Sequence, residues 1–115
     1  MKTKLVKLED LQPTDELRKE TVSFLETLGD EEIISKTGFA QAWLINGKLY
    51  ISDGNNRSGI MAAKGINEIT VEYKEESEDC FGIIKILLFR AKKLRKMGIH
   101  NPYDLWDNYQ KRQKA

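Results

Sequence analysis

The clearest candidates for chemistry in this sequence lie in one short polar turn, Asp53–Arg57. The run Lys48–Ser52 before it predicts a strand, and Asn56–Lys64 predicts a small helix that ends at Gly65. The turn therefore lies at a helix N-terminus, where backbone N–H groups have no acceptor within the helix. These donors, the positive end of the helix dipole and the Arg57 guanidinium together suit an anion such as a phosphate.

Each residue of the turn has a type that suits this role. Gly54 permits a backbone conformation closed to other residues and a close approach of a ligand. Asn55 and Asn56 tolerate positive φ and can cap the helix, and Arg57 can hold two phosphate oxygens. Asp53 could bind a hydroxyl, orient Arg57 or help to hold a magnesium ion. An ordinary strand-to-helix turn with an N-cap has the same residue types, so this reading stays open.

The elements around the turn predict a mixed α/β (α+β) fold, with a small mixed sheet and flanking helices. Thr14 has the character of an N-cap and predicts a helix that ends at Gly29. Asn46-Gly47, between two apolar runs, predicts a β-hairpin whose second strand leads into the turn. We expect one domain over residues 1–115, with a core at about 4–74 and C-terminal helices at about 77–112.

The long helix predicted after Ser77 carries apolar residues on more than one face. One side would cover the sheet, and the other would meet the last helix or a second subunit, so a homodimer is a possible assembly. The helix and the tail are also rich in lysine and arginine. This could be a solvated face that complements the helix dipole or a stripe that contacts nucleic-acid phosphates.

Composition limits the function classes. The 115 residues carry 19 Lys and Arg against 18 Asp and Glu, so the net charge of +1 does not support a general nucleic-acid or membrane binder. Cys80 is the single cysteine and His100 the single histidine, which excludes an intramolecular disulfide and a multi-histidine metal site. We expect a cytoplasmic protein without a membrane span and assign no metal-ligating residues.

The sequence resembles the ParB/sulfiredoxin superfamily, which includes the ParB-like nuclease domain. The resemblance rests on Asp53-Gly54-Asn55-Asn56-Arg57, on the segment Ala62–Ile66 with the strand Ile69–Val71, and on the opening Val6–Pro13. It covers roughly residues 4 to 74. It implies that Gly54, Asn55, Asn56 and Arg57 contact the phosphates of a nucleotide, with Asp53 in a supporting role.

The chain departs from the family members with known chemistry. Sulfiredoxins place a catalytic cysteine and a His-Arg pair in this turn, where this chain has Asn55, Asn56 and Arg57. Partition proteins that bind CTP show a Gly-Glu-Arg-Arg turn and a downstream DNA-reading domain, and free-serine kinases use a histidine-rich turn. No catalytic residue can be assigned, so whether the chain is an enzyme is left open.

Two functions from different classes follow. The first is a ParB-like domain that binds a phosphate-containing ligand, a nucleotide, at Asp53–Arg57, with a nucleoside triphosphate and magnesium as the implied cofactors. The second is a non-catalytic DNA-associated module that contacts DNA phosphates through Arg57 and the C-terminal Lys and Arg residues. A third option is a regulatory protein that keeps the fold without the ligand.

Overall fold

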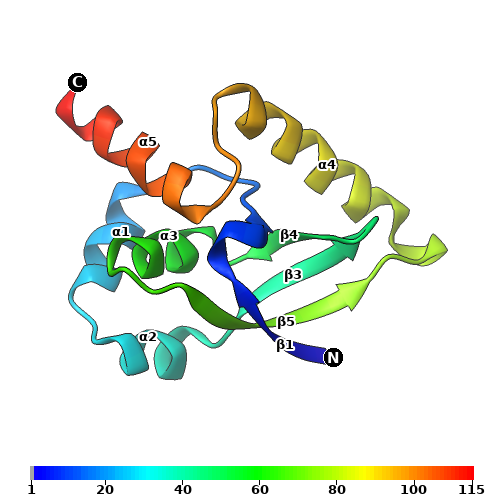
Figure 1. Cartoon of the computed structure of the whole chain (residues 1–115), viewed down its shortest axis with the longest axis horizontal. Helices are drawn as coiled ribbons and strands as arrows, with labels where there is room; N and C mark the ends of the chain where they lie inside the picture. Colours follow the sequence, from blue (N-terminus) through cyan, green and yellow to red (C-terminus); the bar gives the residue numbers. More distant parts are fainter. Residues whose placement is uncertain (1) are drawn as a thin grey trace.

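A computed structural model describes residues 2–115 of the chain. Within this range a five-stranded sheet is flanked by helices, a mixed α/β fold as predicted (Figure 1). The strands are β1 (Lys2–Lys7), β2 (Leu11–Gln12), β3 (Ala40–Ile45), β4 (Lys48–Asp53) and β5 (Glu68–Glu75). The α-helices are α1 (Lys19–Glu26), α2 (Asp30–Thr37), α3 (Asn55–Ala63), α4 (Phe81–Lys96) and α5 (Pro102–Lys114). Short 3₁₀ turns occupy Leu8–Asp10 and Glu78–Cys80.

The sheet has the order β1-β5-β3-β4-β2 and mixes both pairing directions. β1 pairs antiparallel with β5 and β3 antiparallel with β4, whereas β5 runs parallel to β3 and β2 parallel to β4. The predicted hairpin is confirmed, because Asn46 (φ 49°) and Gly47 (φ 79°) join β3 to β4. β4, the strand that leads into the polar turn, therefore lies between β3 and β2 and is not an edge strand.

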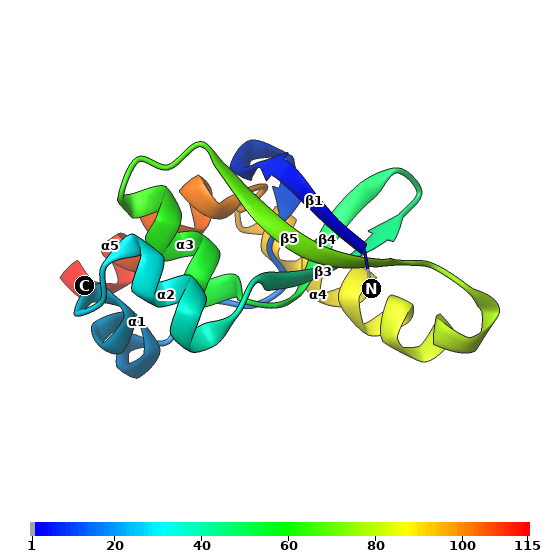
Figure 2. The same ribbon diagram turned by 90° about the horizontal axis from the view of Figure 1, so that it is seen from below.

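Both faces of the central strands are buried. Ala42 on β3 and Ile51 on β4 belong to the main core, which also contains residues of α1, α2, α3 and α5. Trp43 and Tyr50, the adjacent residues on these strands, face the other way and pack against Leu87 and Ala91 of α4. The period-2 alternation of a strand accounts for this division. Helices α1, α2 and α3 gather at one end of the sheet, and α4 runs along the other (Figure 2).

The prediction that Thr14 caps the first helix is wrong. Thr14 is buried, its hydroxyl donates to the carbonyl of Ile51, and its N–H donates to Asn55 Oδ1 at 2.9 Å. These bonds attach Thr14 to the end of β4, so it is not available to cap a helix. α1 begins only at Lys19 and ends at Glu26, earlier than the expected end at Gly29, which instead directly precedes α2.

Of the two C-terminal helices, α5 begins where the sequence predicts, whereas Ser77 makes no side-chain capping bond and α4 begins only at Phe81. The side-chain oxygen of Asn101 accepts a hydrogen bond from the N–H of Asp104, and Pro102 is the first residue of α5. Ser77 precedes the 3₁₀ turn that leads into α4. None of the helices that the structure describes has the length and hydrophobicity needed to cross a bilayer.

Candidate functional site

The polar turn is shaped by Gly54. This residue lies between β4 and α3 with φ 110° and ψ 22°, a left-handed conformation that favours glycine. A Cβ at this position would lie 2.9 Å from the Cβ of Ala40 on the neighbouring strand. Both the backbone conformation and the close packing therefore require glycine, so Gly54 has a structural role whether or not a ligand binds.

The two asparagines tie the turn to the loop before α1. Asn55 is buried, and its Oδ1 accepts from the N–H of Thr14 while its Nδ2 donates to Thr14 Oγ1 at 3.3 Å. Asn56 Oδ1 accepts from the N–H of Arg18 at 2.9 Å. Both asparagine side chains thus hold chain segments about forty positions earlier in the sequence, and neither caps α3.

Arg57 is also engaged within the protein. Its Nη1 donates to the carbonyls of Thr37, Gly38 and Phe39 at 2.7, 2.9 and 3.0 Å, at the point where α2 leads into β3. Its Nη2 lies 3.1 Å from Asp53 Oδ2. The Arg57 side chain is only 12% exposed, whereas that of Asp53 is 71% exposed. Arg57 therefore stabilises the turn, and part of its charge is balanced by a carboxylate that is largely exposed to solvent.

The backbone N–H groups in the first turn of α3 have the fewest hydrogen-bond acceptors within the described residues. No side-chain hydrogen bond caps this helix among the described residues, and the first intrahelical bond here is donated by Ser58 to the carbonyl of Gly54. The N–H groups of the preceding helical residues point out of the first turn, as in any α-helix. Beside the exposed edge of Arg57 they form the electropositive end of α3.

An open pocket of about 310 Å³ lies against this helix end. Four of the five predicted residues line it: Asp53, Gly54, Asn56 and Arg57. Asn55 does not, which agrees with its buried side chain. The other lining residues are Thr21, Phe24, Leu25 and Thr37.

Phe24 is one of four lining residues that the sequence did not indicate as part of a site. Its helical spacing predicts a core position, yet its side chain is 52% exposed on α1. The neighbouring Val22 and Leu25 fill the core instead. The face of an exposed aromatic ring is available to stack on a planar group such as a nucleobase. The sequence carries no signal that separates this phenylalanine from a core residue.

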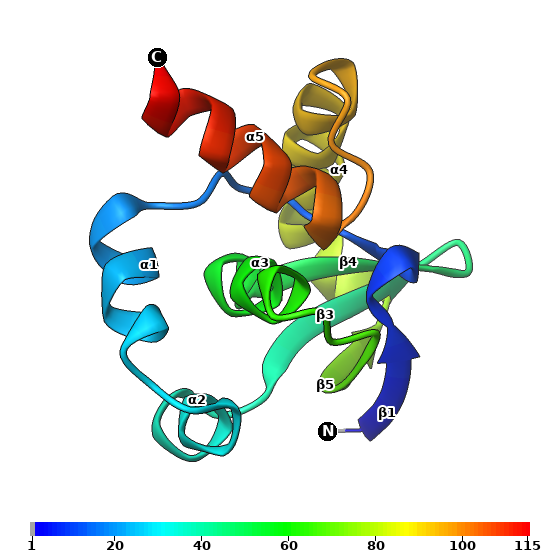
Figure 3. The same cartoon turned by 60° about the vertical axis from the view of Figure 1, so that its left-hand side comes forward.

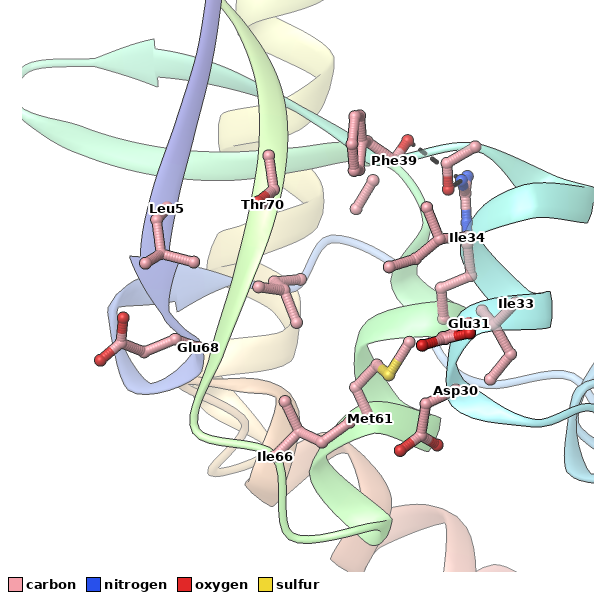
Figure 4. Close-up of a pocket in the computed structure, with 14 residues that line it drawn as sticks. Leu5, Asp30, Glu31, Ile33, Ile34, Phe39, Met61, Ile66, Glu68 and Thr70 are labelled. Atoms are coloured by element: carbon pink, nitrogen blue, oxygen red, sulfur yellow. Dashed lines mark hydrogen bonds between the residues drawn. The ribbon is translucent and has the colours of Figure 1, made fainter.

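A second pocket, of about 260 Å³, opens between α2, α3 and the β1/β5 edge of the sheet (Figure 4). Its walls are mainly apolar and include Ile34, Met61 and Ile66. Asp30, Glu31 and Glu68 add acidic groups, and Asp30 Oδ1 is 2.9 Å from Lys64 Nζ. Arg57 also lines this pocket, but the three acidic groups and the apolar walls do not suit an anion, so the anion-binding prediction concerns the first pocket.

The single histidine and the single cysteine take no part in either pocket. His100 is exposed in the loop before α5, and Cys80 is half-buried, with Ser77 Oγ donating to its Sγ at 3.3 Å. Within residues 2–115, no three His, Cys, Asp or Glu side chains are grouped so that they could hold a metal ion. A magnesium ion at the first pocket would therefore depend on a ligand's phosphates, with Asp53 as the one carboxylate close by.

No protein-family model and no curated protein sequence matches this chain. Two solved structures are similar in fold. One is ParB from Caulobacter crescentus in complex with CTP-γ-S, at TM-score 0.50 and 16% identity over 78% of this chain and 51% of that one. The other is protein Atu1540 from Agrobacterium tumefaciens, at TM-score 0.50 and 12% identity over 73% of this chain and 46% of that one.

These similarities define the class of fold. The chain has a mixed α/β, ParB-like fold, and it spans about half the length of the two structures that it resembles. At such low identity the likeness concerns the fold alone. The neighbour from Caulobacter was solved as a complex with a CTP analogue.

Proposed function

We propose that the chain binds a phosphate-containing ligand, a nucleotide, in the pocket at the start of α3. One observation carries the proposal: four of the five predicted turn residues line an open pocket at a helix N-terminus that no side chain within residues 2–115 caps. The fold shared with a CTP-γ-S complex supports it. A cytoplasmic setting, in which nucleotides are abundant and Cys80 stays reduced, is compatible with this function.

The phosphates would bind at the backbone rather than at the asparagine side chains. The free N–H groups of the first turn of α3 would donate to phosphate oxygens, and the exposed part of Arg57 would supply positive charge. The ring of Phe24 would stack on the base from the opposite wall. Asn55 and Asn56 would act indirectly, because their bonds to Thr14 and Arg18 fix the position of the turn.

Asp53 would decide whether magnesium is needed. Its carboxylate lies 3.1 Å from Arg57 and would repel a phosphate that approaches the same guanidinium. A magnesium ion carried by a triphosphate would turn this repulsion into an attraction. No residue of the pocket is assigned a catalytic role, and a phosphoryl-transfer or hydrolysis reaction would need a second acidic group beside Asp53.

A DNA-associated module is the second candidate, and the geometry favours it less. Arg57 is directed into the carbonyls of residues 37–39, and Arg112 lies 3.3 Å from Glu16 while donating to the carbonyl of Leu17. Helix α4, which carries several of the C-terminal lysines, lies across the molecule from α2, beside which Arg57 is held (Figure 3). A single straight duplex would not reach both groups of cations easily.

The decisive experiment is a titration of the full chain with the four common nucleoside triphosphates, with and without magnesium, by calorimetry and thermal shift. Phe24→Ala should weaken nucleotide binding about fivefold or more through the lost stacking, while Phe81→Ala, at an exposed phenylalanine outside the pocket, should leave it unchanged. If no nucleotide binds under either condition, the proposal is wrong. Salt-sensitive binding to duplex DNA would then favour the second candidate.

Asp53→Asn separates the two roles of this carboxylate. If it only repels the ligand, the variant should bind a magnesium-free nucleotide up to about fivefold more tightly. If it helps to hold magnesium, the variant should lose affinity when magnesium is present. Asp107→Asn, an exposed carboxylate on α5, serves as the matched control. Arg57→Ala is a poor test of binding, because it also removes three hydrogen bonds to the backbone.

A further inference from the structure

The outer face of α4 carries an apolar strip that nothing in the described structure covers. Ile83, Ile86 and Phe89 follow one another at spacings of three residues and are 49%, 51% and 72% exposed. Residues at this spacing lie close together on a helix surface. The adjoining side of the same helix, with Leu87 and Ala91, is buried against β3 and β4. The helix is therefore apolar on two faces and packed on one.

The helix is also strongly polarised in charge. Acidic residues precede it, from the end of β5 through the loop to the 3₁₀ turn: Glu75, Glu76, Glu78 and Asp79. Basic residues occupy its last turns: Lys92, Lys93, Arg95 and Lys96. All of these residues except the half-buried Arg95 are exposed. Interaction with the helix dipole explains the order of the charges, but it does not explain the exposed apolar strip between them.

We propose that this strip is a homodimer interface in which α4 packs antiparallel against α4 of a second copy, with the two-fold axis at Ile86. Positions at equal distances on either side of Ile86 then face each other across the axis. Ile83 lies three residues before it and Phe89 three residues after it, so each Ile83 packs beside the Phe89 of the other copy. The three apolar side chains form a self-complementary centre.

The same symmetry pairs opposite charges. Asp79 lies seven residues before Ile86, in the 3₁₀ turn that directly precedes α4, and Lys93 lies seven residues after it. In the antiparallel dimer, this acidic turn of one copy lies beside the basic last turns of α4 of the other, which brings Asp79 close to Lys93. A parallel arrangement would instead place acid beside acid and base beside base, which is unfavourable. Charge complementarity thus selects a second copy of this chain in one orientation.

The proposed interface is small, and its area limits the affinity of the dimer. α4 has 16 residues and is therefore about 24 Å long. One face of such a helix buries less than the roughly 800 Å² per partner of a standard interface. We expect a dimer that dissociates in the micromolar range and forms without any nucleotide, so its presence or absence is independent of the proposed ligand pocket at α3.

Sedimentation velocity of the full chain over a wide concentration range tests the proposal. The unchanged chain should move from monomer to dimer as its concentration rises, and Ile86→Glu should weaken dimerisation by at least about tenfold. Leu5→Glu changes another exposed apolar residue, on β1, and should have no effect. Thermal unfolding of the diluted monomers controls for folding, because both positions are exposed.

Charge exchange tests the orientation. Asp79→Lys and Lys93→Glu should each dimerise poorly alone, whereas an equal mixture of the two variants should form a heterodimer, and the double variant Asp79→Lys/Lys93→Glu should regain self-association. A monomer at every concentration, equal effects of Ile86→Glu and Leu5→Glu, or no recovery on mixing would overturn the proposal. Binding of an unrelated protein to the strip with no self-association would overturn it as well.

Discussion

The turn at the start of α3 and the outer face of α4 present opposite situations. At the turn, polar groups that could bind a ligand already have partners: Asn55 binds Thr14, and Arg57 binds three carbonyls. On α4, exposed apolar groups such as Phe89 have no described partner. Side chains of a type that suits ligand binding can therefore have all their hydrogen bonds within the protein, whereas side chains of a type that suits the core can remain exposed on the surface.

The largest expected difference in unfolding free energy between two paired variants is that between the two faces of α4. Leu87→Ala removes a side chain that packs against Trp43 and Tyr50 and should lower the free energy of unfolding by about 2–4 kcal/mol. Phe89→Ala, two residues later, should change the free energy of unfolding of the monomer by no more than about 0.5 kcal/mol, because Phe89 is 72% exposed. Urea unfolding at low protein concentration measures both values. Equal losses would show that the outer face is packed in the monomer.

Gly54→Ala should destabilise the turn for two reasons that can be separated. The positive φ costs about 1–2 kcal/mol, and the contact of the new Cβ with Ala40 adds about 1–3 kcal/mol. Gly65→Ala has a similar φ of 78° with nothing within 4 Å of the new Cβ, so it reports the first cost alone. If both variants unfold at the same urea concentration, the contact of the new Cβ with Ala40 does not lower the free energy of unfolding.

Arg57→Ala should lower the free energy of unfolding by about 1–3 kcal/mol, because it leaves the carbonyls of Thr37, Gly38 and Phe39 without this donor. Arg18→Ala removes an arginine whose ion pair with Asp15 is exposed and should cost about 0.5 kcal/mol or less. Chemical denaturation of both variants makes the comparison. If the loss of unfolding free energy at Arg57 is as small as that at Arg18, the bonds to the carbonyls contribute little to stability, and the guanidinium is free to bind a ligand.

The smallest contrast lies between the two asparagines. Asn55→Ala should cost about 1–3 kcal/mol, since it leaves the buried Thr14 groups unpaired. Asn56→Ala should cost about 0.5–1.5 kcal/mol, because the N–H of Arg18 lies in an exposed setting and can bind water instead. Thermal unfolding followed by circular dichroism resolves the difference. A reversed order would mean that Asn56 is the main attachment of the turn to the loop before α1.

Local features of the fold could be predicted from sequence, and tertiary features could not. The Asn46-Gly47 hairpin and the start of α5 at Asn101-Pro102 are confirmed, because each depends on the backbone preferences of a few adjacent residues. Thr14 has the same local character as a helix cap, but distant partners at Ile51 and Asn55 determine its role. Local preference alone does not decide between such alternatives.

The candidate site shows the same limit. The sequence indicated which residues form the turn, and the ParB-like fold that it predicted is the fold observed. The sequence contained no indication that Arg57 would donate to the carbonyls of residues 37–39. It also did not indicate that the Phe24 side chain would be exposed and would line a pocket. Both outcomes depend on how α1 and α2 pack against α3, which no short sequence pattern encodes.

The position of Arg57 has one more consequence, because this residue lines both pockets. Its guanidinium holds the carbonyls of Gly38 and Phe39, and these two residues form part of the wall of the apolar pocket. A ligand that draws the guanidinium toward α3 would release that wall, and a molecule seated in the apolar pocket would in turn fix the guanidinium in place. The two cavities are then thermodynamically linked: each occupant changes the affinity for the other by the same factor.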